Sequence, residues 1–145
     1  MILSIRPFLI TIRFGDIRER IGYTQSGTGT VTKYSDYIQI KTSNAETSTT
    51  DANISGVYDL TNYKTLVVEY KNITQTTNFQ VQVMDKNDTS VIVLRLAMSG
   101  KISSEIKTAT ADVSALNAEY KLRIRNYSTN AVRTGNVYSL KLLAT

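Results

Sequence analysis

The chain has 145 residues, with 17 Lys and Arg against 12 Asp and Glu, which gives a formal net charge of +5 at pH 7. This is the length of one domain, which we expect to span residues 1–145, and about 70% of the extended-chain surface is buried at that size. Cysteine and histidine are absent, which excludes disulfides and thiolate chemistry and removes the commonest general base and metal ligand. The composition therefore favours a non-enzymatic protein. The basic balance favours contact with anions.

The N-terminal segment, residues 1–14 (MILSIRPFLITIRF), is more apolar than any comparable stretch that follows. A basic residue and a proline split its apolar run and no small-residue cleavage site follows, so we do not expect a signal peptide. Phe8, Ile10, Ile12 and Phe14 fall on one face of a strand. Two interpretations stay open: an edge strand of the same sheet, or an arm that uses these residues to pair with a neighbouring subunit.

Alternation of apolar and polar side chains continues along the chain in short runs. These runs lie at 36–42, 66–71, 78–84, 90–98, 105–113, 119–127 and 137–143. The run SVIVLRLAM (90–98) alternates least, which predicts the most central strand, buried on both faces. Polar, turn-rich stretches separate the runs, at 24–30, 42–53, 73–78, 85–90, 99–105 and 128–136. The pattern indicates an all-β fold, an antiparallel β-sandwich of seven to nine strands.

A phrase occurs twice in the chain, as DLTNY at 59–63 and as DVSAL at 112–116. A catalytic carboxylate needs a second carboxylate, a base or a metal beside it, and neither phrase supplies one. An aspartate that starts a turn needs only backbone N–H groups two or three residues further on. We therefore predict that Asp59 and Asp112 form two equivalent corners of the sandwich.

Four longer phrases also have a family resemblance: SGTGTVTKYSDYIQIKT, YDLTNYKTLVVEYKN, ATADVSALNAEYKLRIRNYS and NVYSLKLL. They resemble the carbohydrate-binding-module-like β-sandwich domains of tail-fibre and other virion proteins from phages and prophages of Gram-positive bacteria. The resemblance covers roughly residues 22–145. It implies a jelly-roll-like sandwich in a virion assembled in the host cytoplasm, with other virion proteins and copies of the same chain as partners. The family shares no catalytic residues, so it assigns none here.

A basic stripe is predicted near the C-terminus. Lys121, Arg123, Arg125 and Tyr127 share one face of a strand. Such a face suits phosphate-bearing or teichoic-acid-like polymers, or single-stranded nucleic acid with Tyr127 as a stacking platform. The other interpretation is a solvated outer face whose charge prevents aggregation.

Two turns carry further candidates. Tyr34 and Tyr37 flank a turn and would stack on a sugar ring, or else pack at the rim of the core. Asp85, Asn87 and Asp88 supply hard oxygen ligands on one loop, which makes calcium the metal to consider there; a plain hairpin turn is the alternative. No other cofactor is expected.

The leading prediction is a non-enzymatic structural and adhesion protein of a tailed-phage virion. As a tail, fibre or decoration component it would form oligomers and contact host cell-wall glycans. The alternative is a stand-alone carbohydrate-binding module. A further alternative is a binder of nucleic acid or another anionic polymer, whose affinity would fall steeply with salt. No run reaches the roughly 18 apolar residues of a membrane span, so no membrane partner is expected.

Overall fold

The computed structural model describes residues 9–13 and 22–144. Within these ranges it contains strands and turns, and no helix of the length and hydropathy that crossing a membrane requires. The twelve strands of the described ranges are β1 (Leu9–Arg13), β2 (Tyr23–Gly27), β3 (Thr30–Lys33), β4 (Ile38–Lys41), β5 (Ser48–Ile54), β6 (Tyr58–Asp59), β7 (Thr65–Asn72), β8 (Asn78–Asp85), β9 (Ile92–Ala97), β10 (Lys107–Asp112), β11 (Glu119–Ser128) and β12 (Thr134–Leu143). The predicted all-β, jelly-roll-like antiparallel sandwich is confirmed, with more strands than the seven to nine expected.

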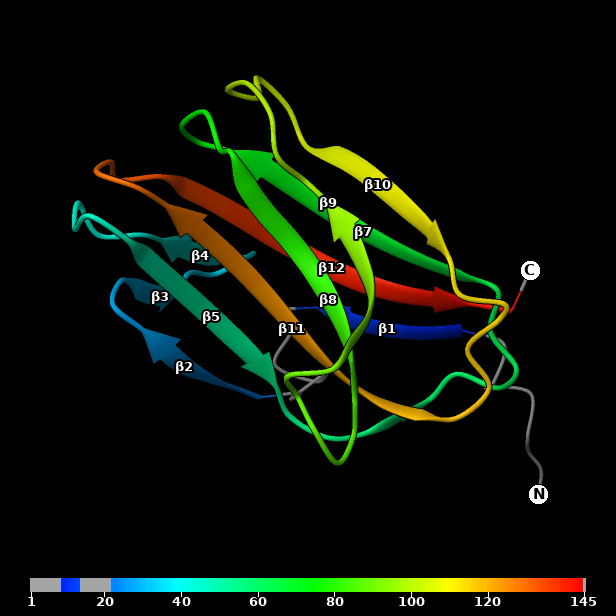
Figure 1. Cartoon of the computed structure of the whole chain (residues 1–145). Helices are drawn as coiled ribbons and strands as arrows, with labels where there is room; N and C mark the ends of the chain where they lie inside the picture. Colours follow the sequence, from blue (N-terminus) through cyan, green and yellow to red (C-terminus); the bar gives the residue numbers. More distant parts are fainter. Residues whose placement is uncertain (1–8, 14–21, 145) are drawn as a thin grey trace.

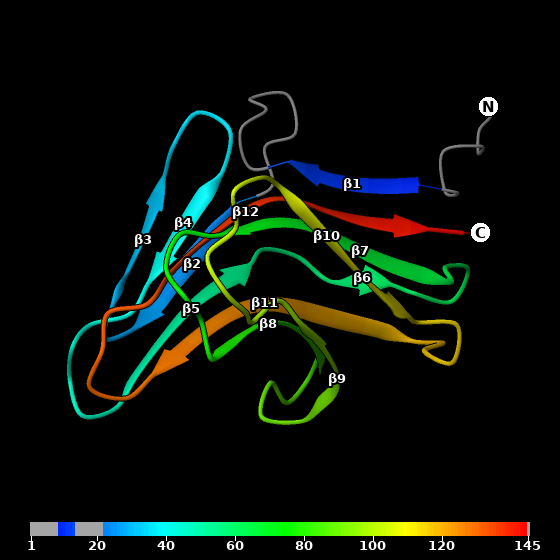
Figure 2. The same ribbon diagram turned by 90° about the horizontal axis from the view of Figure 1, so that it is seen from above.

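The strands form two layers, which Figures 1 and 2 show from two sides. Sheet A has the order β10-β7-β12-β4-β3, with β1 also paired to β12. Sheet B has the order β2-β5-β11-β8-β9, with β6 also paired to β11. All these pairs are antiparallel. Each sheet therefore has one face toward the other sheet and one face outward.

The core lies between the two sheets and follows the alternation of the sequence. The side chains that are fully or almost fully buried there include Ile38, Ile40, Leu66, Val68, Phe79, Val81, Val83, Leu122, Ile124, Leu140 and Leu142. Gly135 on β12 lies against the Phe79 ring. A Cβ atom built on this glycine would be 2.3 Å from a ring carbon. This close approach requires glycine at position 135.

The described part of the N-terminal segment lies in sheet A of the same chain. Leu9 pairs with Leu143, and the register continues to Arg13, which pairs with Ser139. β12 thus borders β4 along its first half and β1 along its second half, while β7 follows its other edge. Two of the four predicted assembly residues, Phe8 and Phe14, lie outside the described residues. An assembly role for this segment, Ile10 and Ile12 included, stays a prediction.

The run at 90–98 is not the most central strand. β9 has a hydrogen-bonded neighbour, β8, on one side only and closes sheet B as an edge strand. Val91 and Val93 are 46% and 41% exposed, while Leu96 packs into the core. The apolar run therefore reflects an edge strand with valines on its outward side, and the prediction of burial on both faces is wrong.

Two stretches predicted as turns contain strands. All of β2 except Tyr23, and the first residue of β3, lie within 24–30, and all of β5 except Ile54 lies within 42–53. The apolar periodicity of β5 is weak, because two of its four inward positions, Ser48 and Thr50, are polar and a third, Ala52, is small. Ser48 and Thr50 are buried, and the Thr50 hydroxyl donates a hydrogen bond to the Lys41 carbonyl oxygen (3.2 Å). Buried hydroxyl groups with such partners are tolerated in a core.

The repeated phrase forms two corners, as predicted. Oδ1 of Asp59 accepts hydrogen bonds from the backbone N–H (3.0 Å) and the hydroxyl group (2.5 Å) of Thr61. Asp112 accepts a hydrogen bond from the N–H group two residues further on (2.8 Å). Leu60 and Val113, which follow the two aspartates, are fully buried. Each aspartate therefore organises a turn, and the next residue anchors that turn in the core.

Candidate functional site

The outward face of sheet B carries polar side chains on five neighbouring strands. Strand pairing aligns them in two rows: Thr24, Asn53, Arg123, Gln82 and Arg95 in the first, and Ser26, Asp51, Arg125, Gln80 and Ala97 in the second. We call these ten residues the polar face; all but Ala97 have a polar side chain. Neighbouring strands lie about 4.8 Å apart, so each row spans roughly 19 Å.

A forked ion pair lies near the middle of the polar face. Nε of Arg125 donates to Oδ1 of Asp51 (2.8 Å), and Nη2 donates to Oδ2 (2.9 Å). The side chains are 28% and 7% exposed, respectively. The hydrogen bond to Asp51 raises the pKa of Arg125 above its ordinary value. Because two parallel charge-assisted hydrogen bonds fix both planes, this pair holds its two strands and its two side chains in one geometry.

Arg123 is the next basic side chain along β11 and is more buried. Its exposed fraction is 9%, and its Nε donates to Oε1 of Gln82 (2.7 Å). Burial lowers the pKa of Arg123, repulsion from Arg125 lowers it further, and Asp51 partly offsets both. Among the described residues, its hydrogen-bond partner is thus a neutral amide. A charged group is held at the surface of the sheet without a carboxylate of its own.

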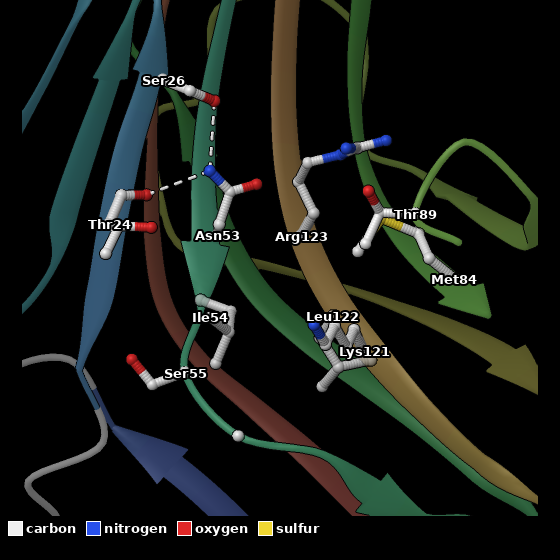
Figure 3. Close-up of a pocket in the computed structure, with 11 residues that line it drawn as sticks. Thr24, Ser26, Asn53, Ile54, Ser55, Met84, Thr89, Lys121, Leu122 and Arg123 are labelled. Atoms are coloured by element: carbon white, nitrogen blue, oxygen red, sulfur yellow. Dashed lines mark hydrogen bonds between the residues drawn. The ribbon is translucent and has the colours of Figure 1, made fainter. Parts of the chain in front are cut away.

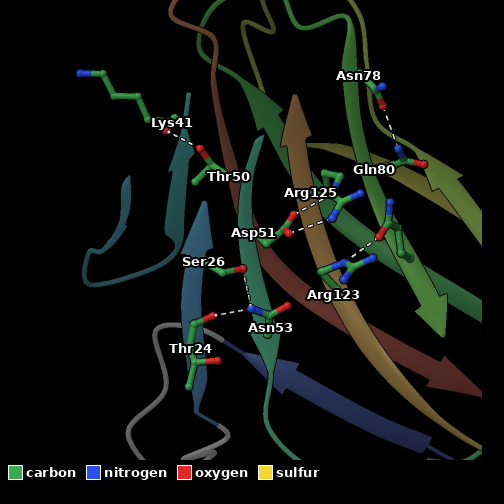
Figure 4. Close-up of polar contacts among 11 residues, drawn as sticks. Thr24, Ser26, Lys41, Thr50, Asp51, Asn53, Asn78, Gln80, Arg123 and Arg125 are labelled. Atoms are coloured by element: carbon green, nitrogen blue, oxygen red, sulfur yellow. Dashed lines mark hydrogen bonds and ion pairs between the residues drawn. The ribbon is translucent and has the colours of Figure 1, made fainter. Parts of the chain in front are cut away.

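Two further side chains of the polar face, those of Asn53 and Gln80, also form hydrogen bonds (Figure 4). Nδ2 of Asn53 donates to the Thr24 carbonyl oxygen (3.3 Å) and to the Ser26 hydroxyl oxygen (3.1 Å). Nε2 of Gln80 donates to Oδ1 of Asn78 (2.7 Å). These contacts limit side-chain rotation before any ligand binds, which reduces the entropy lost on binding.

Two open depressions lie on this face. The larger, about 600 Å³, is lined by β2, β5, β11 and the end of β8, and Lys121 and Arg123 contribute to it (Figure 3). The smaller, about 310 Å³, is lined by residues that include Arg95, Arg125 and Tyr127. Because neighbouring side chains of β11 line both, the two depressions form one elongated polar surface.

The predicted basic stripe lies on this surface. Lys121, Arg123, Arg125 and Tyr127 occupy alternate positions of β11, and each lines one of the two depressions. The alternating pattern therefore predicted correctly that these four side chains lie on the same face of the strand. Their role in binding a ligand stays a prediction.

The two predicted tyrosines lie elsewhere. Tyr34 and Tyr37 lie between β3 and β4 of sheet A, with ring centroids 5.0 Å apart, and Tyr37 also contacts Tyr138 (5.2 Å). Tyr34 is 44% exposed. The structure thus places these rings on the other sheet, apart from the basic stripe, and a role in sugar binding stays a prediction.

The predicted calcium loop connects β8 and β9. Oδ1 of Asp85 accepts hydrogen bonds from the N–H groups of Asn87 (2.8 Å) and Asp88 (3.2 Å). Oδ1 of Asp88 accepts hydrogen bonds from the N–H and hydroxyl groups of Ser90 (3.0 and 2.6 Å). These oxygens organise the turn. The described residues include no group of three or more acidic side chains that could hold a metal ion, and calcium binding stays a prediction.

Of the ten residues of the polar face, only Arg123 and Arg125 are predicted site residues. Among the eight that the sequence does not single out, three add a charge or contact an arginine: Asp51, Gln82 and Arg95. A weak signal exists for Gln82, because the run NFQVQVM (78–84) places amides at alternate positions. Asp51 lies in a stretch that has the composition of a loop, and Arg95 lies in a run that was predicted to be buried on both sides. Only the pairing of distant strands brings them beside Arg123 and Arg125.

No family model matches the sequence, and no curated protein matches it. Solved structures with a similar fold include a family 29 carbohydrate-binding module, 15% identical, with a TM-score of 0.63 over 94% of this chain and 88% of that one. An aspartate-to-alanine variant of such a module, in complex with mannohexaose, is 15% identical, with a TM-score of 0.63 over 94% and 91%. The glycoside hydrolase domain structure of Endo-D from Streptococcus pneumoniae is 12% identical, with a TM-score of 0.57 over 85% of this chain and 22% of that one.

At these identities the likeness concerns the fold. The chain therefore has the β-sandwich fold of family 29 carbohydrate-binding modules, and the outward face of its sheet B carries an elongated polar surface.

Proposed function

We propose that this chain is a carbohydrate-binding module and that its glycan lies across the polar face of sheet B. The observation that carries the proposal is the pair of cross-strand rows. Hydrogen bonds join six of their side chains in three pairs, and all their residues except Asp51 and Ala97 line two open depressions. The likeness of the fold to carbohydrate-binding modules supports the same function.

The chemistry of the polar face suits sugar hydroxyl groups. Each hydroxyl group donates one hydrogen bond and accepts others, and amide side chains such as Asn53 and Gln80 offer both kinds of group. Tyr127 adds one aromatic ring at an end of the surface, where the apolar face of a sugar can pack on it. Because these groups are already ordered, binding costs less conformational entropy than it would on a mobile loop.

Binding without hydrolysis is the better-supported form of this function. Glycoside hydrolysis usually needs two carboxyl groups on opposite sides of the scissile bond. The polar face has one, Asp51, and it is held by both donors of the Arg125 fork. The described face therefore offers hydrogen bonds and charge rather than an acid and base pair.

Affinity electrophoresis of the purified chain through a panel of polysaccharides, followed by calorimetry on those that retard it, tests the proposal. Asn53→Ala and Gln80→Ala should each weaken binding about fivefold, because each removes hydrogen bonds worth about 1 kcal/mol. Thr108→Ala is the matched control, since Thr108 is an exposed residue of β10 in sheet A. Loss of binding in the control alone would contradict the site, and no retardation by any polysaccharide would contradict the function.

This is the alternative function predicted from the sequence, and the fold likeness supports it better than the virion component predicted first. Phage origin, location in a virion, homo-oligomerisation and contact with cell-wall glycans stay predictions. A module that binds wall glycans would serve such an adhesin, and the mass of the protein in solution measures whether it forms oligomers.

A further inference from the structure

The charges that line the two depressions have one sign. Lys121 and Arg123 line the larger depression, and Arg95 and Arg125 line the smaller one. No Asp or Glu is among the described residues that line either. The one carboxylate of the polar face is that of Asp51. The four cationic side chains that line the depressions therefore outnumber the carboxylates on the face.

The carboxylate of Asp51 is paired with the guanidinium group of Arg125. Both of its oxygens accept hydrogen bonds from Arg125, and one carboxylate balances one guanidinium group. Within the described ranges, no ion-pair partner is found for Lys121, Arg123 or Arg95. Three cations therefore remain for a ligand.

Of these three cations, Arg123 gives the strongest indication of an anionic ligand, because it is largely buried. Removing a charge from water is costly unless an opposite charge or several hydrogen bonds replace the water. The structure supplies one hydrogen bond, from Arg123 Nε to Gln82, and places Arg125 two residues away on the same face. An anion bound beside the remaining guanidinium nitrogens would supply the missing compensation, and its geometry would match a carboxylate, sulfate or phosphate group.

The spacing of these cations fits a polymer with repeated charges. Residues two apart on a strand are about 7 Å apart, which separates Arg123 from Arg125. Arg95 lies two strands from Arg123 in the same row, at roughly 10 Å. A chain that carries an acidic group at short intervals can therefore contact more than one of them, and such contacts reinforce one another.

From this arrangement we infer that the glycan bound on the polar face is acidic, a polysaccharide that carries carboxylate, sulfate or phosphate groups, with Arg123, Arg95 and Lys121 as its anion-binding residues. The inference rests on the proposed function and specifies its ligand. Single-stranded nucleic acid has similar charge but relies on several aromatic platforms for its bases. Tyr127 is the one aromatic residue among the described lining of the two depressions, which favours a glycan.

Matched pairs of polymers test the charge of the ligand directly. We would compare polygalacturonate with its fully methyl-esterified form, dextran sulfate with dextran, and phosphomannan with mannan, all at about 0.15 M salt, where charges more than about 8 Å apart are screened. In each pair the backbone is kept and the charge is removed. We expect at least tenfold tighter binding of the acidic member in one pair or more, and the pair that shows it identifies the anionic group.

Variants of the chain test the site. Arg123→Gln and Arg95→Gln should each weaken binding of the acidic polymer about tenfold and change binding of its neutral partner less than twofold. Because Arg123 is buried, Arg95→Gln on the exposed edge strand β9 keeps the test valid if the first variant folds poorly. Lys101→Gln removes the same charge from the exposed loop between β9 and β10 and should leave binding unchanged.

The outcomes separate the inference from the function on which it rests. Equal affinity for both members of every pair would overturn the acidic ligand and leave glycan binding intact. An equal loss in Lys101→Gln and Arg95→Gln would overturn the site, because net charge alone would then explain the binding. Failure to bind any of the six polymers would overturn both proposals. So would tighter binding of an oligothymidylate than of any polysaccharide, which would identify a nucleic-acid binder.

Discussion

The outward faces of the two sheets arise from the same alternating pattern, but their ion pairs differ in burial and in the charges beside them. On sheet A, Glu69 accepts a hydrogen bond from the Ser139 hydroxyl group and lies 3.4 Å from Nζ of Lys141. The two side chains of this ion pair are about one third exposed. On sheet B, the pair of Asp51 and Arg125 is more buried and has a second guanidinium group beside it.

This difference indicates what each face contributes. An exposed pair of opposite charges is screened by water, so it contributes little to stability and attracts little. A buried pair beside an unmatched cation holds its geometry and keeps a positive potential at the surface. The ion pair of sheet A therefore matches one charge with one opposite charge, whereas the ion pair of sheet B has an unmatched guanidinium group, that of Arg123, beside it.

The largest effect that tests this comparison is expected from Asp51→Asn. The change would leave Arg123 and Arg125 adjacent and without a carboxylate, which should lower the free energy of unfolding by about 2 kcal/mol. This loss of unfolding free energy is smaller than that expected for a fully buried ion pair, because the Arg125 side chain is 28% exposed. Urea denaturation followed by circular dichroism measures it.

Lys141→Gln is the matched change on sheet A. Both partners of that ion pair are partly exposed, so the expected loss is under about 0.5 kcal/mol. If the two variants lost the same stability, burial would not distinguish the two faces and the comparison would be wrong.

A smaller effect is expected on binding, from two tyrosines that lie on opposite sheets. Tyr127→Ala removes the ring that lines the smaller depression on sheet B and should weaken glycan binding about fivefold, equivalent to about 1 kcal/mol. Tyr34→Ala, on the turn before β4 in sheet A, should leave the affinity unchanged. Calorimetry with a retarded polysaccharide measures both. The opposite order would move the site to the tyrosines of sheet A.

The parts of the fold that could be predicted from the sequence are those whose inward positions are apolar. β7 alternates without interruption, with Leu66 and Val68 in the core, so periodicity alone identifies it. β5 lies next to the centre of sheet B but presents Ser48 and Thr50 inward. Its place in the sheet depends on pairing with β11, which lies about 70 to 80 residues further along the chain, and no local pattern reveals this pairing.

The candidate site divides in the same way. The basic stripe of β11 needs only one strand and a period of two, so the sequence predicts which of its side chains share a face. The partners of this stripe come from other strands. Asp51 and Gln82 reach Arg125 and Arg123 through pairings that span 74 and 41 residues of sequence. Which arginine of the polar face has a carboxylate partner, and which does not, therefore depends on how the strands pair. That pairing is known only from the fold.

The smallest expected effect concerns the two corners at Asp59 and Asp112, which are the last residues of β6 and β10. Hydrogen bonds from Thr61 and Ser114 lower the pKa of these carboxyl groups below their ordinary value. A carboxyl group whose pKa is lower in the folded state stabilises the fold above its unfolded pKa of about 3.9, and this contribution is lost as the pH falls through the folded value.

The melting temperature should therefore fall more steeply below about pH 4 in the unmodified protein than in the double variant Asp59→Asn/Asp112→Asn, whose amides do not titrate. Thermal unfolding between pH 7 and pH 3 measures the difference. Thr61→Ala/Ser114→Ala is the matched control, because it keeps both carboxylates and removes only the hydroxyl donors, so its pH dependence should lie between the other two. Identical profiles for all three proteins would mean that the corners hold their shape through buried Leu60 and Val113 alone, and that the repeated aspartates add no charge-dependent stability.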